Sequence, residues 1–125
     1  MTVRGSGSRS EQGSATVLAA GLSLVLVTAA TIAVFVAAAV LASHRARAAA
    51  DLSALAAATA MAAGFNPCLT AQRIAAENGA TVISCEVAGT QSSFVVAVSV
   101  SVATGLGSPL PGEAHADAHA GNATG

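Results

Sequence analysis

The chain has 125 residues, which leaves room for one small domain beyond any membrane segment. A hydrophobic fraction of 54% and a charged fraction of 9% are typical of a membrane protein rather than a soluble one. The net charge of -1 gives no basic surface for nucleic acid, so we expect no nucleic-acid partner.

A polar leader, residues 1–13, comes first, and an apolar run without any charged side chain follows at residues 14–43. The run exceeds the ~20 apolar residues that a membrane-spanning helix needs, so we predict a transmembrane helix surrounded by membrane lipid. Arginines lie on both sides of the run and do not decide its orientation. The short leader, the later cysteines and the larger part of the chain after the run favour a single-pass cell-membrane protein with a cytoplasmic N-terminus and an extracytoplasmic C-terminus.

An alternative fate of the apolar run stays open. Val40, Leu41 and Ala42 form a small-residue cleavage signal before Ser43. Cleavage by signal peptidase would release a small secreted protein that acts on extracellular partners. The run is longer than the ~7–15 apolar residues of an ordinary secretory signal, and this favours the membrane anchor.

Residues 44–104 are predicted to form a small extracytoplasmic α+β domain built on a continuation of the same helix. Alanine, the best helix former, dominates this continuation, and Gly64 followed by Pro67 predicts its end. One face of the helix is expected to pack on the elements that follow. This face comprises Ala48, Leu52, Leu55, Thr59 and Ala62.

Smaller elements are predicted after the long helix. Thr70 is expected to cap a short helix over residues 71–78. Residues 81–87 and 94–102 are expected to pair as a β-hairpin, and the second strand has the clearest period-2 alternation in the chain. Its alternating row comprises Phe94, Val96, Val98, Val100 and Val102.

The last segment, residues 105–125, is rich in Gly, Pro, Ala and His, and we predict a disordered tail. Asn122, Ala123 and Thr124 match a glycosylation acceptor, a pattern short enough to arise by chance. Two cysteines, Cys68 and Cys85, follow the apolar run. An even cysteine count in a small exported segment favours a disulfide between them, with two buried free thiols as the alternative.

No catalytic set emerges from the remaining polar residues, so we expect neither an enzyme nor a cofactor. His115, Asp117 and His119 are of metal-ligand types, but no fourth ligand or rigid frame accompanies them, and no metal site is predicted. Asp51 follows Arg47 by one helical turn, which predicts a surface ion pair. Contact of Asp51 with a partner subunit is the alternative.

Three short sequence motifs occur in an order that can be compared with known families. Residues 48–58 read Ala-Ala-Ala-Asp-Leu-Ser-Ala-Leu-Ala-Ala-Ala and include Asp51 and Leu55, while residues 11–17 read Glu-Gln-Gly-Ser-Ala-Thr-Val. Residues 78–80, Asn-Gly-Ala, precede a Cys-bearing strand and a Val-rich strand. In this order the motifs resemble those of the TadE/TadG-like family, pseudopilin-like components of the tight-adherence (Flp) pilus, and in particular its short TadE-like branch in high-GC bacteria.

The resemblance implies a pilin-like fold of the α+β class. A long N-terminal transmembrane helix continues into a small exported domain with a short helix and a β-hairpin. It also implies a structural role as a minor pilin or assembly accessory of a Tad/Flp-type pilus or related secretion system, with other Tad/pilin-like subunits as partners. Prepilin peptidase would remove the leader between Gly13 and Ser14. Family members usually carry Glu at the fifth mature position, where this chain has Leu18.

Overall fold

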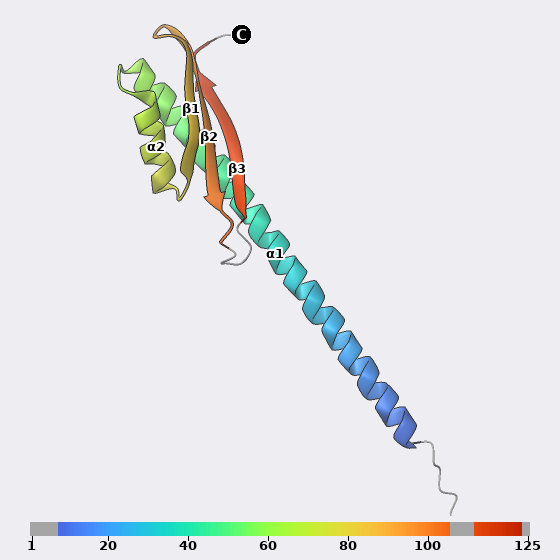
Figure 1. Ribbon diagram of the computed structural model, residues 1–125. Coiled ribbons are helices and arrows are strands. Elements are labelled where there is room, and N and C mark those ends of the chain that lie inside the picture. The colour runs from blue at the N-terminus through green and yellow to red at the C-terminus, as the bar shows by residue number, and fades with distance from the viewer. Residues whose placement is uncertain (1–7, 106–111, 124–125) are drawn as a thin grey trace, which may run out of the picture. The chain divides into compact units, whose positions relative to one another are not determined.

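The computed structural model describes residues 8–105 and 112–123, with side chains from residue 12 onward. The chain divides into two compact units, Met1–Val36 and Ala37–Gly125. In chain order the elements are α1 (Ser8–Ala62), α2 (Pro67–Glu77), β1 (Thr81–Thr90), β2 (Ser93–Ala103) and β3 (Glu113–Gly121) (Figure 1). The protein therefore has an α+β fold with one long N-terminal helix.

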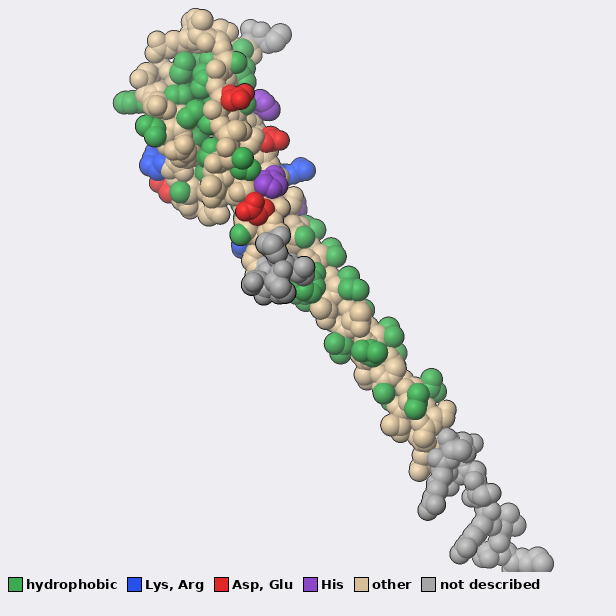
Figure 2. Space-filling model, viewed as in Figure 1, with side chains coloured by type: hydrophobic (Ala, Val, Ile, Leu, Met, Phe, Trp, Pro, Cys, Tyr) green, Lys and Arg blue, Asp and Glu red, His purple; other side chains and the backbone are tan. Residues whose placement is uncertain are grey.

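Within the described residues, the first unit is the N-terminal part of α1 up to Val36, which carries most of the apolar run. Its most apolar window has a mean hydropathy of 2.7, and hydrophobic side chains line this part of the helix (Figure 2). Hydroxyl groups within it donate hydrogen bonds of 2.8–2.9 Å to carbonyl oxygens one turn earlier, and these come from Thr16, Ser23, Thr28 and Thr31. These hydroxyl groups are thus satisfied within the helix, as a helix in lipid would require. By length and composition, α1 is able to cross a membrane.

In the second unit, α1 lies against one face of the sheet and α2 packs beside β1 (Figure 1). The core joins small residues of α1 to the bulky row of β2. On α1 it contains Ala46, Ala49, Ala50, Ala54, Ala57 and Ala58, and on β2 it contains Phe94, Val96, Val98, Val100 and Val102. The predicted alternation of β2 is confirmed by its burial pattern.

The packing face of α1 was predicted wrongly. Leu52 and Leu55 are 48% and 61% exposed, whereas Ala50 and Ala57, on the other side of the helix, are fully buried. Alanine lets the helix backbone approach a sheet whose valines already fill the interface, and a leucine row would overpack it. The leucines therefore face away from the sheet.

Gly64 ends α1, as predicted. Its φ of 82° is left-handed, a conformation that glycine adopts without steric penalty. The N–H of Gly64 donates to the Met61 carbonyl at 3.1 Å, and the N–H of Phe65 donates to the Ala60 carbonyl at 2.8 Å. This pair of bonds is a Schellman motif, which satisfies carbonyl groups at the helix end.

The predicted cap of the short helix is wrong. Asn66 caps α2, because its side chain accepts a hydrogen bond from the Leu69 N–H at 3.1 Å and Pro67 occupies the first turn. A proline there has the helical φ already fixed and lacks an N–H that would be unpaired. The Thr70 hydroxyl instead donates to the Asn66 carbonyl within the helix, at 3.1 Å.

The predicted disorder of residues 105–125 is wrong for residues 113–121, while residues 106–111, 124 and 125 lie outside the described part of the chain. Residues 113–121 form β3, which pairs antiparallel with β2, so the expected hairpin is a three-stranded sheet of order β1-β2-β3. Alanines alternate with polar residues along β3, and the row of alanines faces the core. Alanine has a low strand propensity, so the segment reads as unstructured until β2 offers it an edge. The Asn122 side chain links the end of β3 to the start of β2, because it donates to the Ser92 carbonyl and accepts from the Phe94 N–H.

Ser53 provides a stability test of the core. Its side chain is fully buried, and its hydroxyl has no hydrogen-bond partner among the described residues. We expect Ser53→Ala to raise the free energy of unfolding by about 1 kcal/mol, since it removes an unpaired buried polar group. Thermal unfolding in detergent, followed by circular dichroism, measures the change. The control Thr59→Ala alters an exposed hydroxyl, and a loss of stability in Ser53→Ala would show that the hydroxyl is bonded.

Candidate interaction surface

The residues with metal-ligand side chains lie on a strand rather than on a tail. His115, Asp117 and His119 all point to the exposed face of β3, at alternate positions. The Ser99 hydroxyl donates a hydrogen bond to the Asp117 carboxylate, and His115 Nε2 lies 4.0 Å from a carboxylate oxygen of Glu113. No group of three or more His, Cys, Asp or Glu side chains within the described residues is placed to hold a metal ion.

Asp51 does not form the predicted ion pair with Arg47. Ion pairs among the described residues join Arg73 to Glu77 and His115 to Glu113. Asp51 and Arg47 instead line a hollow of about 410 Å³ together with His115, Ala116 and Asp117. Acidic and imidazole side chains gather on this side of the second unit (Figure 2). The Asp51 carboxylate is thus exposed and has no cationic partner in the described part of the chain.

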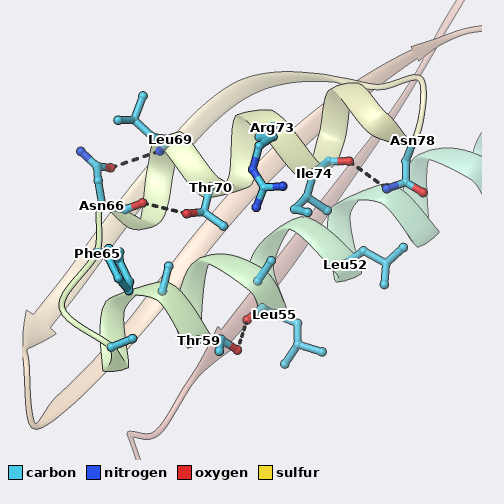
Figure 3. Close-up of a pocket in the computed structure, with 13 residues that line it drawn as sticks. Leu52, Leu55, Thr59, Phe65, Asn66, Leu69, Thr70, Arg73, Ile74 and Asn78 are labelled. Atoms are coloured by element: carbon cyan, nitrogen blue, oxygen red, sulfur yellow. Dashed lines mark hydrogen bonds between the residues drawn. The ribbon is translucent and has the colours of Figure 1, made fainter.

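An apolar groove of about 1060 Å³ lies between the end of α1 and α2 in the second unit (Figure 3). Ile74 is a half-buried apolar residue of the groove. The other large apolar side chains of the groove are strongly exposed: Leu52 48%, Leu55 61%, Phe65 71% and Leu69 64%. Its wall on α1 consists of Leu52, Leu55, Ala56, Thr59 and Ala60, with Ala63 directly after the helix. Its wall on α2 includes Leu69, Thr70, Arg73 and Ile74. Apolar surface concentrated in this way marks an interaction site.

Arg73 is the charged residue of the groove wall. Its side chain extends from α2 over the groove toward α1 (Figure 3). It bonds Glu77 at 3.2 Å, but both side chains are more than half exposed, so the pair contributes little to stability. A guanidinium has five N–H donors, and one carboxylate leaves some of them free. The groove therefore suits an apolar partner that carries a carboxylate.

A cysteine pair fixes the position of the α2 wall. Cys68 on α2 and Cys85 on β1 lie at disulfide distance, with the sulfurs 2.01 Å apart. Within α2 the buried residues are Ala71 and Ala75, which bring little apolar area to the core. The covalent link is thus a major restraint on α2 and on the width of the groove.

The candidate leader junction lies within α1. The helix begins at Ser8, before Gly13 and Ser14, and no other group comes within 4 Å of a Cβ built on Gly13. Leu18 is 71% exposed. An apolar residue at this position inserts into lipid without the energetic penalty of a carboxylate.

The groove itself escaped prediction from the sequence. Three residues of its wall, Leu52, Leu55 and Thr59, were expected to pack on the elements that follow α1. No interaction surface was predicted around Arg73. The detectable signal is the spacing of Leu52, Leu55 and Thr59, which alternates three and four residues. Such spacing produces an apolar face wherever it occurs on a helix and does not specify what covers that face.

Comparison with known proteins identifies no relative, since no family model, no curated protein and no solved structure matches this chain. The likeness of residues 48–58 to the TadE/TadG-like signature therefore supports only a proposed function. The groove and the exposed Asp51 are the features of the described residues from which a role can be inferred.

The cysteine pair generates a prediction about α2. We expect Cys68 and Cys85 to resist alkylation until a reductant is added. The double variant Cys68→Ser/Cys85→Ser should lose about 3 kcal/mol of stability, because the bridge closes a loop of sequence separation 17. Hydrogen exchange of the full chain should then accelerate in α2 and much less in β2. Ready labelling of both thiols without reductant would exclude the bridge.

Proposed function

We propose that this protein is anchored in the cell membrane by α1 and serves as a TadE-like minor pilin or assembly accessory of a Tad/Flp-type pilus or related secretion system. The observation that carries the proposal is the exposed leucine face of α1 beside the groove. Full burial of a leucine is worth about 1.5–3 kcal/mol, so two exposed leucines on one face favour association with another subunit. The role is structural.

The helix arrangement supports this role. One unbroken helix, α1, supplies both the apolar stretch and the alanine face of the core in the second unit. A helix used in this way has a structural role, because it anchors an exported domain to the membrane. Its partners in the proposal are membrane lipid, other Tad/pilin-like subunits and, for removal of the leader, prepilin peptidase.

The cysteine pair supports the proposed orientation. Disulfides persist in oxidising compartments and are rare in the cytosol. With Cys68 and Cys85 at bonding distance, the second unit fits the outer side of the membrane and the leader fits the cytoplasmic side.

A specific observation favours the alternative of a secreted protein. Ala42 is the first buried residue of the second unit, and the rest of its core extends from Ala46 onward. Cleavage before Ser43 would therefore leave nearly all of this core intact. The released product would act on extracellular partners through the same groove.

The mass of the mature protein, which identifies its first residue, distinguishes the membrane-anchored form from the secreted form. We expect the protein in the membrane fraction, beginning at Ser14 or retaining its leader, because the apolar part of α1 stays in the lipid. Gly13→Val should block a prepilin-type cleavage, whereas Val40→Phe disturbs the signal-peptidase motif and should change nothing. A product that begins at Ser43 and occurs only in the culture supernatant establishes secretion instead.

The pilus role has a genetic test in the producing organism. Deleting the gene should reduce the number of surface filaments counted by electron microscopy, because an assembly component is missing. Wild-type protein supplied in trans should restore the filaments, and Leu55→Asp should not, since it places a charge on the exposed face of α1. Unchanged filament numbers after deletion refute the assembly role.

A further inference from the structure

We propose that the groove is occupied by a second copy of this chain, with the two α1 helices packed in parallel and Asp51 of each copy paired with Arg73 of the other. The proposal rests on the membrane anchoring given under the proposed function and adds the partner and its contacts. It follows from three observations in the second unit: a repeat on α1, an unpaired acid beside it and a cation on the opposite wall.

The repeat lies on the outward face of α1. Its positions are separated alternately by four and three residues, and all are exposed: Ala48, Leu52, Leu55, Thr59 and Ala62. Apolar residues with this spacing form the contact line of a left-handed two-helix coiled coil. The α1 helix thus carries a second packing face, opposite the alanine face that covers the sheet.

The direction of pairing follows from the anchor. Two spans inserted with the same topology present their α1 helices in the same sense, which gives a parallel pair. A two-fold axis along the helices then places the same surface of both copies in contact. The outward face of α1 in each copy contacts the same face of the other copy, and each copy thereby covers the groove of the other.

Charge complementarity identifies the partner as a copy of this chain. With Leu52 and Leu55 at the a and d positions, Asp51 occupies g and Ala56 occupies e. In a parallel pair, a g residue faces the e residue five positions further along the other helix, so Asp51 faces the second copy's Ala56. Ala56 and Arg73 line the same groove. Asp51 is therefore directed to the wall that carries a guanidinium.

Both ionic groups have capacity for this contact, although Arg73 is bonded to Glu77 and Asp51 shares its hollow with Arg47 and His115. Asp51 has no ion pair among the described residues, and the exposed bond to Glu77 leaves donors of Arg73 unused. A guanidinium can bind two carboxylates at once through separate N–H groups. The other polar side chains of the groove are already bonded, since Asn66 accepts from the Leu69 N–H and Asn78 donates to the Ile74 carbonyl.

The apolar part of the proposal is tested on the full chain in detergent micelles. Self-association is measured by energy transfer between differently labelled copies across a range of protein-to-detergent ratios. Leu55→Asn should weaken association roughly tenfold, because a polar group replaces a central contact. The matched control is Ile83→Asn, a residue of similar exposure on β1 outside the groove (56% against 61%). Equal effects of the two variants contradict the proposal.

A charge exchange tests the specific pairing. Asp51→Arg and Arg73→Asp should each weaken association roughly tenfold, since each places like charges together, and the double variant should restore it. Glu77→Gln removes the intrachain partner of Arg73 and should leave association unchanged or stronger. Single variants without effect, or a double variant as weak as the singles, overturn the pairing. If that occurs while deletion of the gene reduces the number of filaments, the assembly role stands and this dimer is rejected.

Discussion

The fold depends on the close contact between the alanine face of α1 and the valine row of β2. A helix can lie near a sheet filled with β-branched side chains only if its own residues are small. From residue 12 onward, the buried positions of α1 are alanines and Ser53. The contact stabilises the second unit with little volume from the helix side. It also determines the rest of the surface, because the large side chains of the same helix must then point outward.

Several features follow from this division of α1. Leu52 and Leu55 are exposed as a result. The turns on either side of α2 and the Cys68–Cys85 pair hold α2 beside these leucines, so that the exposed helix face becomes one wall of a groove. Asp51 lies on the border between the groove side and the β3 side of α1. The residues that gave the chain its family resemblance are thus divided between packing and an open surface. Asp51 and Leu55 lie on the open surface, and the alanines that support the sheet are Ala49, Ala50, Ala54, Ala57 and Ala58.

Much of the fold could be predicted from the sequence because the signals were local. The apolar run, the stop at Gly64 and the alternation of β2 each follow from a short stretch of chain and hold in the structure. Features that depend on distant partners could not be predicted in this way. β3 lacks strand-forming residues and forms because it pairs with the edge of β2. The outward face of α1 was mistaken for its packing face because the prediction considered the hydrophobicity of the side chains and not their volume. The groove was missed for the same reason, since Arg73 and Leu55 come together only when α2 folds back.

The position of β3 bears on the solubility of the protein. β2 is the most hydrophobic strand and has a neighbour on either side, so its backbone is shielded from other molecules. Its outer neighbour carries alternating acidic and imidazole groups on its exposed face, a composition unfavourable to sheet stacking between molecules. Loss of the last segment would uncover a valine-rich edge with the properties of an amyloid-forming stretch. The C-terminal strand thus protects the chain from aggregation, and expression of shortened forms is expected to yield insoluble protein.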